Sequence, residues 1–248
     1  GLADREFGHW MKNIAPGESF KTPEAILSVC KSEDREVIFQ RLTSALEKDV
    51  DRAPASEQSL PIVFNEYCTT WGSPSHDNIA EIVDAIKGRG IEYFVIDCGW
   101  FRRKDVPWHV SMGDYEVSED LFPDGLRKTV DLIKANGMKP GIWFEIDNIG
   151  SEAKAYHLTE HHLKRDGYPL TTDMRRYWDM RQPWVKDYLR ERVIGTLNKY
   201  GFEYMKMDYN DTVGIGCDGA ESLGEGLRQN MEESLAFIRE VKEKVPEI

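Results

Sequence analysis

The stretch LRKTVDLIKANGMKPGIWFE, residues 126–145, combines a helix, a turn and a strand in direct succession. Apolar side chains recur at helical spacing over residues 126–135, which predicts a helix with one buried face. Asn136-Gly137 is a typical signal for the end of a helix. The run over residues 138–145 is mostly apolar, as expected of a strand that is buried on both faces. A helix that leads into such a strand is the repeating unit of a parallel sheet.

The same alternation continues on both sides of this stretch. Strands are predicted over residues 61–67, 92–97 and 202–208, and helices over residues 77–87, 184–199 and 220–244. Strands that alternate with helices indicate βαβ units and therefore a parallel sheet. Four such units match either half of a (β/α)8 barrel or a small doubly wound sheet, and the residues at the strand ends decide between these folds.

Residues 1–60 have a different pattern from the rest of the chain. A strand is expected over residues 25–30 and an amphipathic helix over residues 32–50. Residues 51–60 (DRAPASEQSL) have the composition of a linker. The alternating part of the sequence therefore begins near residue 61.

The composition excludes several classes of protein. The 248 residues include 32 Lys and Arg and 44 Asp and Glu, which gives a net charge of −12. A nucleic-acid partner is not expected, because binding to phosphates requires a basic face. A membrane partner is not expected either, since the sequence has no long apolar run. The four cysteines form no CxxC pair, so we expect no zinc ribbon and place the protein in the reducing cytoplasm.

Each of the four predicted strands ends in polar residues. They are Asn65, Glu66, Asp97, Glu145, Asp147, Lys206, Asp208 and Asn210. The carboxyl ends of parallel strands lie along one rim, where barrel enzymes carry their active sites. Side chains alternate along a strand, so Lys206 and Asp208 point to the same side. A single acid at a strand end often only caps the next helix, but four strands in succession favour a functional rim.

Two tryptophans, Trp100 and Trp143, are close in sequence to an acid of this rim. An aromatic ring suits the C–H face of a sugar, while carboxylates and a lysine suit its hydroxyl groups. The pattern therefore indicates a carbohydrate ligand. The alternative is that these rings fill the interface between helices and sheet, as large aromatic residues usually do.

Two other patterns have weaker support. Residues 214–219 (GIGCDG) match the GxGxxG pattern of dinucleotide-binding proteins, but they do not directly follow a strand. His157, His161 and His162 place two histidines four residues apart on a predicted helix, without the HExxH order of a zinc site. We therefore expect neither a cofactor nor a metal.

Four runs of the sequence, in this order, resemble the α-galactosidases of glycoside hydrolase family 36. They are IDCGWF (96–101), DLFPDGL (120–126), GMKPGIWFEID (137–147) and YMKMDYN (204–210). A fifth run, HWMKNIAPGESFKTPEAIL (9–27), is similar to the end of that family's N-terminal β-sandwich domain. The resemblance implies an α/β fold, a (β/α)8 TIM barrel of which about the first four β/α units are present. It divides the chain into the end of the sandwich domain (1–30), a helix and linker (31–60) and the N-terminal half of the catalytic barrel (61–248).

The resemblance also implies a function, the hydrolysis of terminal α-galactosides with retention of configuration. Asp208 matches the family's nucleophile, and Lys206 and Asp97 match residues that hold sugar hydroxyl groups. Further substrate contacts are expected from Cys98, Trp100, Trp143, Glu145, Asn210 and Arg175 or Arg176. A retaining enzyme also needs a second carboxyl group about 5 Å from its nucleophile. The family's acid/base aspartate lies on a later strand, so we expect this chain to be part of a longer protein and to be inactive alone.

Differences from the family's motifs leave related functions open. Cys98 occupies the position of a second aspartate that reads sugar hydroxyl groups, and Asn65-Glu66-Tyr67 replaces the usual Asn-Ser-Trp. The expected partner is an oligosaccharide or another glycoside. An α-N-acetylgalactosaminidase, a raffinose-type transglycosylase and a non-catalytic carbohydrate-binding relative are alternatives. Members of the family often form tetramers, so a homo-oligomer is also open. The only support for a nucleotide-dependent oxidoreductase is the glycine pattern of residues 214–219.

Overall fold

The computed structural model describes residues 9–31, 33–50, 54–214 and 216–248. The chain divides into two compact units. The smaller unit is Asn13–Pro61, and the larger unit consists of Ile62–Ile248 together with the described end of Gly1–Lys12. All four strands of the predicted parallel sheet belong to the larger unit.

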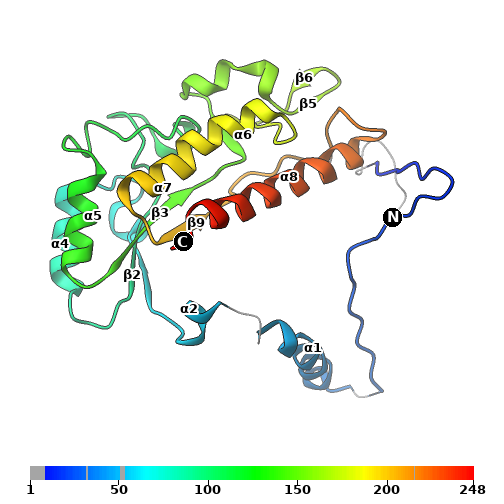
Figure 1. Ribbon diagram of the computed structural model, residues 1–248, viewed down its shortest axis with the longest axis horizontal. Helices are drawn as coiled ribbons and strands as arrows, with labels where there is room; N and C mark the ends of the chain where they lie inside the picture. Colours follow the sequence, from blue (N-terminus) through cyan, green and yellow to red (C-terminus); the bar gives the residue numbers. More distant parts are fainter. Residues whose placement is uncertain (1–8, 32, 51–53, 215) are drawn as a thin grey trace. The chain divides into compact units, whose positions relative to one another are not determined.

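The parallel sheet contains the four strands that the sequence predicts. They are β1 (Val63–Asn65), β2 (Tyr93–Ile96), β3 (Lys139–Phe144) and β9 (Tyr204–Met207). The strands lie in the order β1-β2-β3-β9, and every neighbouring pair is parallel. This order follows the chain without the reversal that a doubly wound sheet requires. The curled sheet is backed by helices (Figure 1), so it has the architecture of a partial TIM barrel.

Helices lie between the strands and after the last strand, β9, and they cover the sheet (Figure 1). They are α3 (Tyr67–Thr70), α4 (His76–Ile86), α5 (Leu126–Ala135), α6 (Pro183–Leu189), α7 (Gly195–Tyr200) and α8 (Leu223–Lys244), with a π-helical turn, η4 (Arg190–Ile194), between α6 and α7. Val83 of α4 and Val130 of α5 are buried in one core with Phe94 of β2 and Ile142 of β3. Removal of these apolar side chains from water is the main force that holds helices and sheet together.

The predicted end of α5 at Asn136-Gly137 is confirmed. Gly137 has a φ of +78°, a left-handed conformation that glycine adopts without strain. Its N–H donates to the carbonyl of Lys134 (3.0 Å), and the N–H of Met138 donates to the carbonyl of Ile133 (3.3 Å). These bonds satisfy carbonyl groups at the end of the helix and turn the chain directly into β3.

Between β3 and α6 the chain forms small elements that the sequence pattern does not predict. They are β4 (Asn148–Gly150), η2 (Lys154–His157), η3 (Thr159–His161), β5 (Lys164–Arg165), β6 (Tyr168–Pro169), β7 (Thr171–Thr172) and β8 (Arg175–Tyr177), and another 3₁₀ turn, η1 (Trp108–Val110), precedes α5. Strands β4, β8 and β7 form an antiparallel sheet, and β5 pairs with β6. Such short strands have no hydrophobic period that could reveal them. The helix expected around His157, His161 and His162 is wrong, because two separate 3₁₀ turns occupy this segment.

The smaller unit contains α1 (Arg35–Val50) and α2 (Ala55–Gln58). Helix α1 confirms the predicted helix, whereas α2 lies inside the stretch with linker composition. The strand predicted over residues 25–30 is wrong, since the described residues show no strand there and Leu27 and Val29 are 90% and 84% exposed. A short apolar run forms a strand only where a neighbouring strand supplies hydrogen bonds and a core buries its apolar side chains.

Candidate active site

The rim at the carboxyl ends of the parallel strands brings together acids that are far apart in the sequence. In the register of the sheet, Trp143 of β3 lies beside Lys206 of β9. Lys206 extends past β3 to Asp97 at the end of β2, and its Nζ lies 2.7 Å from Asp97 Oδ2. Asp208 follows on the same side of the strand, with 3.9 Å between its Oδ2 and Lys206 Nζ.

The acids of the rim differ in their access to solvent. The side chain of Asp208 is 34% exposed, whereas those of Asp97 and Glu145 are 3% and 0% exposed. A group that attacks a substrate must be reached by it, while a buried acid can hold or orient its neighbours. Of these three acids, Asp208 is therefore the one that a molecule from solution can reach.

Several neighbours stabilise the charge on Asp208. Oδ2 accepts a hydrogen bond from Trp143 Nε1 (3.0 Å), and Oδ1 accepts one from the backbone N–H of Tyr209 (3.1 Å). Partial burial opposes the charge, but hydrogen bonds from Trp143, Asn210 and Tyr209 and the ammonium group of Lys206 hold the pKa of Asp208 below its ordinary value. Asp208 is therefore an ionised carboxylate at neutral pH.

Asp97 and Lys206 form an ion pair next to this carboxylate. Asp97 uses its second oxygen, Oδ1, to accept a hydrogen bond from the backbone N–H of Cys98 (2.8 Å). Desolvation opposes the charge on Lys206, but the hydrogen bond and charge of Asp97 and the charge of Asp208 raise the pKa of Lys206. The lysine is therefore a fixed cation between two aspartates.

Gly99 makes the tight turn after Asp97 possible. Its φ is +92°, and a Cβ atom at this position would lie 2.1 Å from the carbonyl oxygen of Gly72. Only glycine combines this backbone conformation with such a close approach of another chain segment. The turn then directs Trp100 into the core.

Glu145, at the end of β3, is held by donors from two other segments. Arg175 Nη1 of β8 donates to Oε1 (3.0 Å), and Asn210 donates its backbone N–H to Oε1 (2.7 Å) and its Nδ2 to Oε2 (3.0 Å). Arg175 Nε also lies 3.3 Å from Asp211 Oδ2. The buried Glu145 therefore fixes the loop that follows Asp208 and ties it to β8.

Among the predicted site residues, Trp100 and Cys98 lie in the core, and Arg176 contacts a residue outside the rim. Trp100 is fully buried, and its Nε1 donates to the carbonyl of Trp143 (2.9 Å). Cys98 is buried in the core between sheet and helices, where desolvation raises the pKa of its thiol. Arg176 packs over the ring of Tyr156 and donates to the carbonyl of that residue (2.8 Å). Their contact with a substrate stays a prediction.

An arc of aromatic rings leads outward from the rim. Ring centroids are 5.9 Å apart for Trp143 and Trp108, 6.2 Å for Trp108 and Tyr67, and 5.5 Å for Tyr67 and Trp71. The ring of Trp143 is fully buried, whereas Trp71 is 68% exposed. Trp71 and Trp108 are not among the predicted substrate contacts, because neither is as close in sequence to an acid of the rim as Trp100 and Trp143 are. Tyr67 enters the prediction only as a difference from the family's Asn-Ser-Trp motif.

Two further strand-end acids have partners that the sequence does not reveal. Glu66 is fully buried, and its Oε1 accepts a hydrogen bond from the backbone N–H of Asp97 (2.8 Å). Asp147 instead accepts a hydrogen bond from Ser234 of α8 (2.6 Å). Position at a strand end was the only available signal for both acids.

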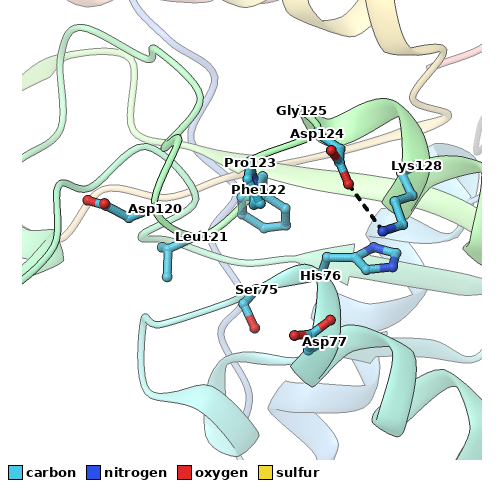
Figure 2. A pocket seen from close by; sticks show the side chains of 10 residues that line it. All are labelled: Ser75, His76, Asp77, Asp120, Leu121, Phe122, Pro123, Asp124, Gly125 and Lys128. Atoms are coloured by element: carbon cyan, nitrogen blue, oxygen red, sulfur yellow. Dashed lines mark hydrogen bonds and ion pairs between the residues drawn. The ribbon is translucent and has the colours of Figure 1, made fainter.

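In residues 9–31, 33–50, 54–214 and 216–248, no three His, Cys, Asp or Glu side chains are grouped to hold a metal ion. None of the helices in the described ranges is long and apolar enough to cross a membrane. A cavity of about 320 Å³ lies at the N-terminal ends of α4 and α5 (Figure 2), and its lining includes Asp124 and Lys128, which pair at 3.2 Å.

The sequence matches the Melibiase family over residues 19–243. This chain belongs to the Melibiase family. Alpha-galactosidase Mel36A of Lactobacillus acidophilus is 29% identical over 212 residues, which cover 85% of this chain and 28% of that protein. Alpha-galactosidase 1 of Pediococcus pentosaceus is 30% identical over 199 residues, which cover 79% of this chain and 27% of that protein. The chain thus spans a little over a quarter of the length of these relatives.

Solved structures have the same fold as this chain. One is a variant of the GH36 α-galactosidase AgaA from Geobacillus stearothermophilus in complex with raffinose, with a TM-score of 0.67 and 25% sequence identity. The match covers 76% of this chain and 27% of that structure. The resemblance to family 36 α-galactosidases that the sequence motifs indicate is therefore confirmed.

Proposed function

We propose that the full-length protein containing this chain is an α-galactosidase that releases terminal α-galactosyl groups with retention of configuration. Family membership and the names of the relatives support this reaction. One observation carries the assignment of the nucleophile, namely the partly exposed carboxylate of Asp208, which lies 3.0 Å from Trp143 Nε1 and 3.9 Å from Lys206 Nζ.

In the first step of the proposed reaction, an oxygen of Asp208 attacks the anomeric carbon of the galactosyl group. The bond from this carbon to the leaving oxygen breaks, and that oxygen takes a proton from a general acid. The lowered pKa of Asp208 supports this role, because the attacking carboxylate must be ionised. In the second step, water attacks the anomeric carbon, the bond from this carbon to the Asp208 oxygen breaks and frees the carboxylate, and the former acid accepts a proton from this water.

The general acid is proposed to lie beyond residue 248, on a later strand of the barrel. A retaining enzyme places its two carboxyl groups about 5 Å apart. The buried acids of the described rim are engaged otherwise, since Asp97 pairs with Lys206 and Glu145 binds Arg175 and Asn210. These acids are better suited to hold and orient groups than to transfer a proton to a leaving group.

Asp97 and Lys206 are proposed to bind hydroxyl groups of the sugar. A carboxylate accepts hydrogen bonds and an ammonium group donates them, so the pair can engage neighbouring hydroxyl groups in a fixed orientation. The raffinose complex of the AgaA variant makes galactosyl oligosaccharides the proposed substrate class. The aromatic arc that ends at Trp71 offers an apolar surface for the rest of such a substrate.

The proposed architecture follows the resemblance. The sheet β1-β2-β3-β9 forms the first four units of a (β/α)8 barrel over residues 61–248. By this resemblance, residues 1–30 are proposed to correspond to the end of the family's β-sandwich domain, and residues 31–60 to a helix and linker.

The test is hydrolysis by the full-length protein of nitrophenyl α-galactoside, α-glucoside and N-acetyl-α-galactosaminide. We expect kcat/KM to be highest for the α-galactoside, by at least about tenfold. Proton NMR of the first product should show α-galactose. A preference for the N-acetylated substrate would support the α-N-acetylgalactosaminidase instead, and binding without turnover would support a carbohydrate-binding relative. A first product in the β configuration would refute retention.

A further inference from the structure

Glu66 is a buried carboxyl group in the rim that the proposed reaction does not use. It directly follows β1 and is fully buried. Its Oε1 accepts a hydrogen bond from the backbone N–H of Asp97 (2.8 Å), and its Oε2 accepts one from the hydroxyl of Thr70 in α3. These partners are a backbone amide and a hydroxyl group rather than a cation.

The environment of Glu66 places its ionisation near neutral pH. Burial raises the pKa of Glu66 to about 7, although the hydrogen bonds from Thr70 and Asp97 oppose this rise. The charged and titratable groups that face it are the Asp97 carboxylate and the Cys98 thiol, which follow β2, and the Lys206 ammonium of β9. The carboxylate of Asp97 raises the pKa of Glu66 further, and Lys206 lowers it.

A continuous chain of contacts leads from Glu66 to the proposed nucleophile. Glu66 binds the backbone N–H of Asp97, and the carboxylate of Asp97 binds Lys206 Nζ (2.7 Å). Lys206 Nζ in turn lies 3.9 Å from Asp208 Oδ2. A shift of the Asp97 backbone would therefore move the side chain that orients Lys206.

We propose that Glu66 is a positioning residue of the sugar site, which fixes the backbone of Asp97 and holds the Asp97–Lys206 pair most firmly when it is ionised. This inference rests on the proposed function, in which Asp97 and Lys206 bind the sugar. A hydrogen bond to an ionised acceptor is about twice as strong as a neutral one. Protonation of Glu66 weakens its bond to Asp97, so sugar binding tightens as the pH rises through the neutral range.

The test compares the full-length wild type with Glu66→Gln and Glu66→Ala. The values of kcat and KM for nitrophenyl α-galactoside are measured from pH 5 to pH 9. In the wild type, KM should fall as the pH rises through about 7. In Glu66→Gln, the amide oxygen can still accept the hydrogen bond from the backbone N–H of Asp97, but the side chain cannot ionise. The kcat of this variant should therefore stay within about threefold of the wild-type value, and its KM should no longer fall near pH 7. Glu66→Ala, which lacks the acceptor, should raise KM about tenfold.

Two controls separate this inference from the proposed function. Glu203→Gln alters an ion pair with Lys134 at the start of β9, at the opposite end of the sheet, and should leave both parameters unchanged. A wild-type KM profile in both Glu66 variants would overturn the positioning role while the galactosidase activity stands. If the wild type has no turnover, galactose binding by calorimetry is the readout, and Glu66→Ala must weaken it. Absence of both turnover and galactose binding would overturn the function and the inference together.

Discussion

Trp143 donates its indole N–H to Asp208 across the neighbouring strands β3 and β9, with 3.0 Å between Nε1 and Oδ2. The indole ring is fully buried, whereas the side chain of Asp208 is 34% exposed. A donor from the packed core therefore fixes one oxygen of the carboxylate and favours its charged form. Core packing and the proposed chemistry are linked through this single hydrogen bond.

Trp143→Phe should raise the pKa of Asp208, because phenylalanine retains a buried ring but has no N–H donor. A hydrogen bond to a charged group contributes about 1.5–3 kcal/mol, which corresponds to roughly one to two pH units. The proposed nucleophile must be ionised, so the acid limb of kcat/KM should move to higher pH by this amount. The measurement is the pH profile of kcat/KM for nitrophenyl α-galactoside in the full-length protein.

The matched control for this change is Trp184→Phe. Trp184 lies on α6, stacks on His161 with 3.8 Å between ring centroids and is 41% exposed. The profile of this variant should match that of the wild type. An acid limb that stays in place in Trp143→Phe would show that the indole N–H does not control the ionisation of Asp208.

Asp208→Asn should lower kcat by on the order of 10⁴ or more, because the amide cannot form the glycosyl ester. In Asp208→Ala, the removed side chain leaves space at the reacting face, so added azide should restore turnover and yield β-galactosyl azide. Product analysis by NMR with and without azide checks both points. Turnover by Asp208→Asn at close to the wild-type kcat would assign the nucleophile to another residue.

Much of the fold is predictable because its signals are local. The apolar spacing of α5, the turn at Asn136-Gly137 and the apolar run of β3 all lie within residues 126–145. The prediction of a strand over residues 25–30 is wrong because a strand also needs a partner strand, and local composition does not show whether one exists. The small elements between β3 and α6 are held by contacts such as that of Arg175 with Glu145, thirty residues away in sequence. No local period encodes such contacts.

The candidate site is predictable to the level of the strand ends. Alternation along β9 places Lys206 and Asp208 on one side, and the structure brings Asp97 to the same place. The burial of each side chain cannot be predicted from residue type alone. Trp100 and Trp71 are both tryptophans, but Trp100 is buried and Trp71 is exposed. The link from Glu66 to Asp97 also depends on the register of β1 and β2, which only the folded sheet defines.

The raised pKa of Glu66 should make the stability of the protein depend on pH. A carboxyl group with a higher pKa in the folded state binds its proton more tightly there. The pKa of Glu66 rises from an ordinary value of 4.5 to about 7. The stabilising contribution is therefore complete below about pH 4.5 and is lost as the pH rises through about 7. The shift corresponds to about 3 kcal/mol in the free energy of unfolding.

Urea unfolding at pH 5 and pH 8 measures this contribution. Between the two values, the wild type should lose about 2–3 kcal/mol more than Glu66→Gln, which cannot ionise. Other titrating groups contribute equally to both proteins, so the difference isolates Glu66. Parallel pH dependences in the two proteins would mean that Glu66 titrates in the folded state as it does in the unfolded chain.

Gly99→Ala should destabilise the protein and distort the turn that carries Asp97. The new Cβ atom would lie 2.1 Å from the carbonyl oxygen of Gly72, and the φ of +92° is strained for alanine. Because a backbone atom cannot move aside like a flexible side chain, one of the two segments must shift. We expect a loss of about 3 kcal/mol or more in the free energy of unfolding and a higher KM, since Asp97 is two residues away.

Gly88→Ala separates the clash from the backbone strain. Gly88 also has a positive φ, +72°, but a Cβ atom there would have no neighbour within 4 Å. The free energy of unfolding of this variant should therefore fall by only about 1 kcal/mol, because alanine is strained in this conformation. Its KM should equal that of the wild type. Urea unfolding and kinetics of both variants give the comparison. If Gly99→Ala behaves like Gly88→Ala, the contact between the two loops does not set the position of Asp97.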